Sequence, residues 1–202
     1  MGTISKIFNY NAPAPKPALW LKPDRGIILN GSTVSTWEDQ SGNGHDAVQV
    51  DSTKQPTYVQ NGINGRPKLR FTESWMQITN GTNLNIKYIF IVTSLINIYT
   101  DTLGPIGTNP FGAYVLYTIG TNTMHTYWGS FLTPDLLVTP TNKLFVVQFN
   151  SQEFSQPLAL GVGYGGRYWD GDIVEIMIYD KDLTPQEISN CSSYLNIKYN
   201  LG

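Results

Sequence analysis

One stretch near the end of the chain, residues 171–180, constrains the fold more than any other. It reads Gly-Asp-Ile-Val-Glu-Ile-Met-Ile-Tyr-Asp and is rich in β-branched residues. Alternate residues of a strand point to opposite faces, and here apolar side chains occur on both faces. A strand of this kind is covered by other parts of the chain on both sides. The segment therefore predicts a central strand with both faces buried.

A capped helix is predicted a few residues after this strand. Thr184 suits the N-cap, Pro185 suits the first helical position, and Glu187 completes a capping box. The apolar residues that follow at helical spacing are Ile188, Cys191, Leu195 and Tyr199. One face of the helix is therefore expected to pack on the sheet, with Cys191 as a small buried hydrophobe. Because the chain has a single cysteine, an internal disulfide is excluded.

The rest of the chain alternates short apolar segments with turn residues. The run at 88–98 is too rich in β-branched residues for a helix and predicts a second buried strand. Nineteen glycines and twelve prolines fit many turns, and only 14% of the residues are charged. At 202 residues, one all-β domain is the simplest expectation, and the apolar segments suggest roughly a dozen strands.

Three further motifs precede the final strand and helix in a characteristic order. They are Ala-Leu-Trp-Leu-Lys-Pro-Asp-Arg-Gly-Ile at 18–27, Val-Ser-Thr-Trp-Glu-Asp-Gln-Ser-Gly-Asn-Gly-His-Asp-Ala at 34–47, and Gly-Arg-Pro-Lys-Leu-Arg-Phe at 65–71. Through these motifs the region 18–202 resembles laminin-G-like, concanavalin A-like jelly-roll domains. The resemblance implies an all-β fold, a two-sheet antiparallel jelly-roll β-sandwich with a short C-terminal α-helix. It leaves the function open, because such folds serve lectins, glycan-cleaving enzymes, adhesion modules and viral structural proteins.

Residues 1–17 differ from the rest and are predicted to lie outside the sandwich. Their large apolar residues are Ile4, Ile7, Phe8 and Tyr10, and prolines follow at positions 13, 15 and 17. Such spaced prolines favour an extended segment. One interpretation is a disordered tail. The other is an arm that docks the domain onto a larger assembly or another subunit, since four large apolar side chains exceed what a solvated tail needs.

Charge and hydropathy limit the partners and the location of the chain. The net charge of −2 comes without a basic stripe, which argues against a nucleic-acid partner. No apolar run approaches the ~20 residues of a membrane span. The N-terminus lacks the continuous apolar core of a signal peptide, so we expect synthesis and folding in a cytosol. A virion component released by lysis fits this location, and a cytosolic or otherwise released module is the alternative.

The glycine-rich loop after Trp37 carries candidate metal ligands. Asp39, Ser41 and Asn43 place oxygen atoms at alternating positions, as the start of a calcium loop does. The closing glutamate of such a loop is missing, since its twelfth position is Val50. The interpretation we prefer over a Ca²⁺ site is a tight turn whose side chains bond their own backbone. No other cofactor is expected.

Asp170, Asp172 and Glu175 form an acidic pattern with a catalytic analogue. For glycan-cleaving enzymes of the concanavalin A-like fold, the resemblance implies a Glu-x-Asp-x-x-Glu strand that supplies a nucleophile and a general acid. The spacing matches here, although the first position is Asp. A retaining mechanism needs two carboxyls roughly 5 Å apart, and Asp172 and Glu175 share a face only if a bulge intervenes. The alternative is that they hold neighbouring loops or pair with Arg70 or Arg167.

Aromatic residues beside polar ones are the candidates for glycan or partner binding. Trp128 precedes Gly-Ser, and Tyr168 and Trp169 precede Asp170. An aromatic platform with neighbouring hydrogen-bonding groups is suited to the apolar C–H face of a sugar. Aromatic residues also fill cores, and exposed ones serve protein interfaces, so both alternatives remain open.

These observations lead to a functional prediction with two alternatives. We predict a non-catalytic binding or structural display protein on a virion surface, a bacteriophage head-decoration or fibre component. Its arm, residues 1–17, would bind other virion or assembly subunits, and its sandwich would contact host glycans. The first alternative is a soluble carbohydrate-binding module or lectin, and the second is a glycoside hydrolase that uses Asp172 and Glu175. Homo-oligomers are common among display proteins, so a second copy of the chain is a further candidate partner.

Overall fold

The computed structural model describes most of the predicted sandwich. The described residues are 15–80, 84–97, 103–108, 114–118, 123–126, 129–133, 137–152, 157–162 and 167–201. Ile4, Ile7, Phe8 and Tyr10 of the predicted arm, together with Trp128, lie outside these residues.

The regular structure of the described chain is mainly β-strand, with one α-helix. The elements are β1 (Leu19–Leu21), β2 (Ile27–Asn30), β3 (Thr33–Trp37), β4 (Ala47–Val48), the short 3-10 helix η1 (Ser52–Lys54), β5 (Thr57–Ile63), β6 (Arg66–Phe71), β7 (Met76–Ile78), β8 (Ile86–Leu95), β9 (Leu103–Thr108), β10 (Tyr114–Thr118), β11 (Met124–His125), β12 (Gly129–Phe131), β13 (Lys143–Gln152), β14 (Leu158–Leu160), β15 (Gly171–Tyr179) and the helix α1 (Pro185–Tyr199). The predicted all-β class with one C-terminal helix is confirmed.

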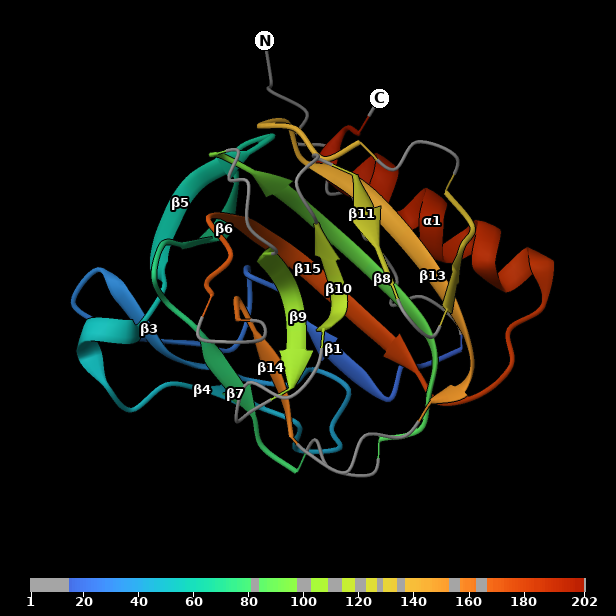
Figure 1. Cartoon of the computed structure of the whole chain (residues 1–202), viewed down its shortest axis with the longest axis horizontal. Coiled ribbons are helices and arrows are strands. Elements are labelled where there is room, and N and C mark those ends of the chain that lie inside the picture. Colours follow the sequence, from blue (N-terminus) through green and yellow to red (C-terminus); the bar gives the residue numbers. More distant parts are fainter. Residues whose placement is uncertain are drawn as a thin grey trace, which may run out of the picture.

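Hydrogen bonds join the described strands into one antiparallel sheet of 15 strands. Its order is β11-β10-β9-β14-β7-β4-β3-β5-β6-β15-β8-β13-β12, with β1 beside β15 and β2 beside β3. The sheet curls strongly, so that β9, β10 and β14 lie across β8 and β15 (Figure 1). Strands that are distant in the sheet order therefore face one another.

Strand β15 lies at the centre of this arrangement, and all 9 of its residues are buried. It pairs with β8 along one edge and with β6 and then β1 along the other. Ile176 and Ile178 point into the larger of two apolar clusters, whereas Met177 and Tyr179 point into the smaller one. The prediction of a central strand with both faces buried is therefore confirmed.

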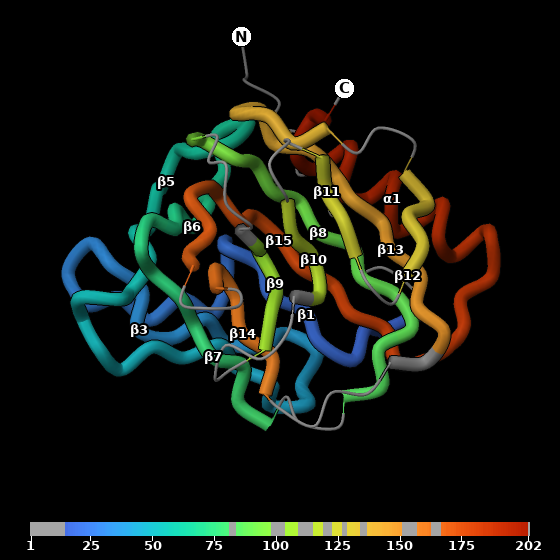
Figure 2. Tube along the Cα trace, viewed as in Figure 1, coloured from blue at the N-terminus to red at the C-terminus, as the bar shows by residue number. Residues whose placement is uncertain are grey.

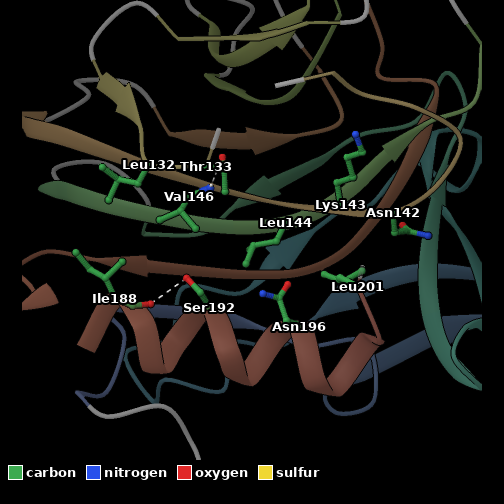
Figure 3. A pocket seen from close by; sticks show the side chains of 10 residues that line it. All are labelled: Leu132, Thr133, Asn142, Lys143, Leu144, Val146, Ile188, Ser192, Asn196 and Leu201. Atoms are coloured by element: carbon green, nitrogen blue, oxygen red, sulfur yellow. Dashed lines mark hydrogen bonds between the residues drawn. The ribbon is translucent and has the colours of Figure 1, made fainter. Parts of the chain in front are cut away.

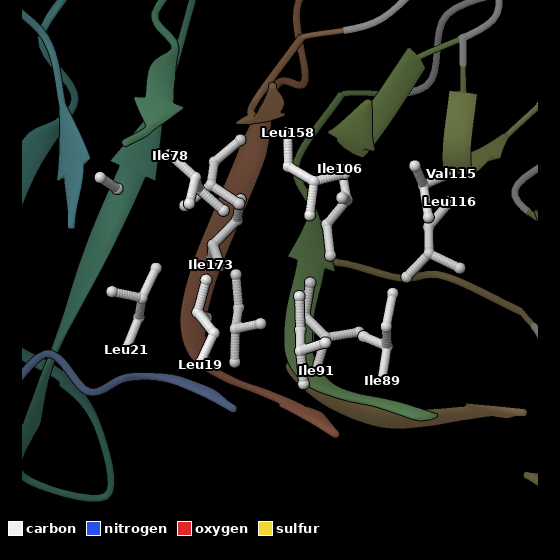
Figure 4. Packing of buried hydrophobic residues seen from close by; sticks show 14 of the residues in the cluster. Leu19, Leu21, Ile78, Ile89, Ile91, Ile106, Val115, Leu116, Leu158 and Ile173 are labelled. Carbon is white, nitrogen blue, oxygen red and sulfur yellow. The ribbon is translucent and has the colours of Figure 1, made fainter. Parts of the chain in front are cut away.

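The larger apolar cluster fills the inside of the curl. It brings Ile106 of β9 and Leu158 of β14 together with Ile91 of β8 and Ile173 of β15 (Figure 4). These side chains are fully buried, and each buried Å² of apolar surface stabilises the fold by about 25 cal/mol. The curl is therefore held closed mainly by packing between its two halves.

The smaller cluster lies on the outer side of β8, β13 and β15, beneath α1. Figure 2 shows α1 alongside β13, at the outside of the sheet. The predicted capping box is present, because Thr184 Oγ1 accepts from the backbone N–H of Glu187 and Glu187 Oε2 accepts from that of Thr184. Cys191 is buried against the sheet, and its sulfur lies 3.1 Å from the Tyr179 hydroxyl. The predicted packing of one helix face is confirmed.

Other local predictions also hold. Residues 88–95 of the apolar run predicted at 88–98 form most of β8, in which all residues but Lys87 are buried, and Ile98 lies outside the described residues. The turn between β2 and β3 has Gly31 at φ 64°, in the left-handed region that glycine enters without strain. Within the described chain, no helix is long and apolar enough to cross a membrane.

Candidate functional site

A buried carboxylate joins the two ends of the described chain. Glu175 of β15 is fully buried. Its Oε1 accepts from Trp20 Nε1 at 2.6 Å and from the Tyr194 hydroxyl at 3.0 Å. Its Oε2 accepts from Lys198 Nζ at 2.7 Å and from the Tyr199 hydroxyl at 2.5 Å. Glu175 thus connects β1, β15 and α1 through four donors.

The tyrosines of this network are held protonated. Burial raises the pKa of the Tyr194 and Tyr199 hydroxyls, and the adjacent Glu175 carboxylate raises it further. Both hydroxyls therefore remain donors throughout the neutral pH range. Lys198 balances the charge, and its Nζ also lies 3.2 Å from Asp24 Oδ2. The arrangement is that of a satisfied structural ion pair rather than a reactive group.

The second candidate carboxylate, Asp172, is also fully engaged. Its Oδ2 lies 2.6 Å from Lys68 Nζ and 3.1 Å from Ser94 Oγ. Arg70 donates to both of its oxygens, through Nε to Oδ1 and through Nη2 to Oδ2. The structure therefore shows Asp172 paired with Arg70, as the structural interpretation of the acidic pattern expected.

The bulge that a catalytic pair would require does occur. The pairing of β15 with β8 shifts register between Ile173 and Glu175. Both Asp172 and Glu175 consequently have their partners on the side away from the larger apolar cluster. Every oxygen of the two carboxylates already accepts a hydrogen bond from the fold. This geometry suits anchoring and does not poise either group as a nucleophile or proton donor.

The candidate metal loop is closed by its own hydrogen bonds. Asp39 Oδ1 accepts from the backbone N–H groups of Trp20 and Ser41, and Oδ2 accepts from Ser41 Oγ and the His45 N–H. Asn43 Nδ2 donates to the carbonyl of Ala18 at 2.8 Å. No cluster of three His, Cys, Asp or Glu residues occurs in the described part of the chain. The loop thus serves as a clamp that holds β1.

The three neighbouring candidates Tyr168, Trp169 and Asp170 have different environments. Trp169 is fully buried in the larger apolar cluster, so its expected role as a surface platform is corrected to a core role. Asp170 is also buried, and its Oδ2 accepts from Asn97 Nδ2 at 2.6 Å. Tyr168 is half-buried, and Lys54 Nζ lies 4.9 Å from its ring centroid. Tyr168 is therefore the candidate of the three that keeps a surface role.

Sequence reasoning missed Lys54, a neighbour of Tyr168, and Trp75, a neighbour of Lys54. Lys54 of η1 contacts the Tyr168 ring, and the Lys54 carbonyl accepts from the backbone N–H of Trp75 at 3.0 Å. The Trp75 carbonyl in turn accepts from Gln49 Nε2 at 2.8 Å, and the Trp75 side chain is half-buried. We call Lys54, Trp75 and Tyr168 the aromatic rim. The sequence signal that could have drawn attention to Trp75 is a lone Trp that follows a polar Thr-Glu-Ser turn.

Comparison with known proteins gives a structural likeness only. No protein family and no curated protein matches the sequence. The structure is similar to that of Trypanosoma rangeli sialidase in complex with sialic acid, with a TM-score of 0.60 and 13% identity over 93% of this chain. The complex of that sialidase with 2,3-difluorosialic acid, a covalent intermediate, has a TM-score of 0.55 and 14% identity over 92% of this chain. In both cases the match covers 34% of the sialidase, so this chain spans about a third of the sialidase length.

This likeness overturns the predicted function. The two solved structures named above are sialidases, which are enzymes, and not virion proteins. The predictions of a bacteriophage display protein and of a non-enzyme are therefore wrong. They relied on the arm and on an inferred site of synthesis, neither of which bears on the chemistry of the folded domain.

Proposed function

We propose that this chain is a glycan-binding domain of a glycan-processing protein, with a lectin-like β-sandwich of the concanavalin A-like class. The observation that carries the proposal is the likeness to the sialidase structures. It extends over 93% of this chain but only 34% of the sialidase, which is the relation expected of one domain within a larger enzyme.

The fold supports a sandwich of this class. The 15-stranded sheet curls until β9 and β14 face β8 and β15 across the larger apolar cluster. Two facing layers around one core are the arrangement that a two-sheet jelly roll would have, with the strands at the bend joining the layers. The Trp37 strand and the Asp39 loop, two parts of the laminin-G-like pattern, serve this core and hold β1.

The aromatic rim supports a place for the glycan. Tyr168 is half-buried, and the Lys54 ammonium lies over its ring. An aromatic ring packs against the C–H face of a sugar, while an ammonium attracts a carboxylate. An acidic sugar of the sialic acid type, which one of the sialidase structures contains, would use both groups.

Binding of 3′-sialyllactose, measured by isothermal titration calorimetry, tests this proposal, with lactose as the matched neutral probe. We expect sialyllactose to bind more tightly than lactose. Tyr168→Ala and Lys54→Ala should each weaken binding about tenfold, a loss of about 1.4 kcal/mol. Lys87→Ala is the control, because Lys87 pairs with Asp182 on a different part of the surface. Equal affinity of the parent and the Tyr168→Ala chain would remove the rim from the proposal.

A second candidate function is glycan hydrolysis by this chain itself, which the enzymatic nature of the sialidases favours. Release of 4-methylumbelliferone from its sialoside tests it directly. If hydrolysis occurs, Asp172→Asn and Glu175→Gln distinguish the two roles of these carboxylates. A structural role predicts lower stability with turnover per folded molecule retained, whereas a catalytic role predicts loss of turnover in a folded chain.

A further inference from the structure

A cleft with no assigned role runs between α1 and the outer face of β13 (Figure 3). Its volume is about 340 Å³. On the helix side it is lined by Ile188, Ser192 and Asn196, which recur at every fourth residue and so form one row along α1. On the strand side it is lined by Leu144 and Val146, alternate residues on one face of β13.

A second cavity continues this cleft towards the end of the helix. It has a volume of about 680 Å³ and reaches Asn64 and the C-cap residue Asn200. The two cavities share Asn142, Lys143 and Leu201 as lining residues. We call the pair the helix groove. From Ile188 to Asn200 it follows α1 for roughly 18 Å, which is a length suited to a linear ligand.

One acceptor in the groove lacks a donor. Asn142 Oδ1 is buried and has no hydrogen-bond partner among the described residues, and Asn142 lies where the two cavities meet. A buried acceptor without a donor destabilises the protein until a donor reaches it. Rotation of the half-buried Asn142 amide would turn this oxygen towards the groove, where a hydroxyl group of a bound molecule would supply the donor.

The remaining lining indicates the class of ligand. Amide side chains, which both donate and accept, come from Asn64, Asn142, Asn196 and Asn200, and neither cavity is lined by a described carboxylate. Sugar hydroxyls likewise both donate and accept, so they match amides well. Two lysines also line the groove, and both are already engaged: Lys68 at the far end is neutralised by Asp172, and Lys143, which lines both cavities, has an interaction within the fold. This disfavours an acidic ligand. Leu144 and Val146 provide an apolar floor for C–H groups.

A peptide fits this groove less well than a saccharide does. Peptide recognition by strand addition needs an open strand edge. The groove instead lies over the face of β13, whose residues 143–148 pair with β8 along one edge. The helix side offers only side chains, because the backbone of α1 is bonded within the helix. The contacts on offer are therefore side-chain amides, hydroxyls and aliphatic groups.

We propose that the helix groove binds a neutral linear oligosaccharide, at a site separate from the aromatic rim. This inference deepens the proposed glycan-binding function and depends on it. The groove would hold an uncharged stretch of a glycan chain, with a sugar hydroxyl donating to Asn142 Oδ1. The rim would bind an acidic sugar independently.

The test titrates the full chain with four neutral tetrasaccharides, cellotetraose, maltotetraose, mannotetraose and chitotetraose. Asn196→Trp fills the groove from an exposed helix position, and Asn142→Ala removes the unpaired acceptor. Each change should weaken binding of the best tetrasaccharide at least tenfold. Ser193→Trp, an exposed residue of the same helix that does not line the groove, is the matched control and should leave affinity unchanged. Thermal melting confirms that each variant is folded.

Parallel titration of the Tyr168→Ala chain, and of every chain with 3′-sialyllactose, separates the two proposals. Loss of tetrasaccharide binding in Asn196→Trp but not in Tyr168→Ala supports the groove. Tetrasaccharide binding that survives Asn196→Trp overturns the groove, as does a parent chain that binds sialyllactose and no tetrasaccharide. In the latter case the proposed function stands. If the parent chain binds neither probe class, both proposals fail.

Discussion

At the scale of single residues, two buried carboxylates of the central strand β15 link that strand to neighbouring elements by hydrogen bonds and ion pairs. Glu175 satisfies donors from β1 and α1, and Asp172 does the same for Lys68 and Arg70 of β6. A buried ion pair gives little net stability relative to apolar packing, but the loss of one member leaves the other uncompensated. These carboxylates therefore define which elements meet more than they add to the total stability.

Removal of the Glu175 carboxylate tests this view. Glu175→Ala leaves the Trp20, Tyr194 and Tyr199 donors without their acceptor and strips Lys198 of one acidic partner. We expect a loss of about 3 kcal/mol in the free energy of unfolding, measured by urea denaturation. Glu38→Ala, at an exposed position, should change it by less than about 0.5 kcal/mol. Equal urea midpoints for the two variants would contradict the role of Glu175 in linking β1 and α1 to β15.

At the scale of elements, α1 is defined locally but positioned globally. The box formed by Thr184 and Glu187 fixes where the helix begins, and Asn200 in the left-handed conformation ends it. The packing of its buried residues Cys191, Leu195 and Tyr199 then fixes the position of the helix on the sheet. The capping box and the C-cap each depend on residues close together in the sequence. The position of the helix on the sheet depends instead on strands that are far away in the sequence.

Loss of the cap should loosen the helix without moving it. Thr184→Ala removes the hydroxyl that accepts from the Glu187 N–H, and we expect a destabilisation of about 1 kcal/mol. Amide hydrogen exchange should quicken most in the first turn of α1. Ser193→Ala, on the exposed face of the same helix, should leave stability the same or slightly higher. Uniform exchange along α1 in the Thr184→Ala chain would show that the cap does not hold the helix start.

At the scale of the whole molecule, local patterns predicted much of the fold and little of the candidate site. Some features depend on residues that are close together in the sequence, so local patterns predicted them. They are the apolar pattern of β15, the capping box of α1 and the turn at Gly31. The contact between Lys54 and Tyr168 joins distant segments, and the burial of Trp169 depends on the closed curl. No periodicity in the sequence reports such contacts. The acidic pattern at 170–175 had catalytic spacing, but its partners made it structural.

The buried tyrosines make the whole fold sensitive to alkali. Burial raises the pKa of Tyr179, Tyr194 and Tyr199 in the folded chain, whereas in the unfolded chain tyrosine titrates near its usual value of about 10. A pKa that is higher in the folded state gives stability that is complete below pH ~10 and is lost as pH rises beyond it. Circular dichroism melts from pH 7 to 12 should show the melting temperature falling mainly above pH ~10. An unchanged melting temperature at pH 12 would show that these hydroxyls are not buried.

The position of β15 has a consequence for how the chain is made. Strands β1, β6 and β8 all pair with β15, yet β15 follows them in the sequence. Trp20 and its hydrogen-bond acceptor Glu175 are 155 positions apart. A ribosome releases these partners before the strand that pairs with all of them, so the nascent chain carries open apolar surface until β15 emerges. Chains that stop short of residue 171 cannot close the curl and are expected to be substrates for chaperones and proteases.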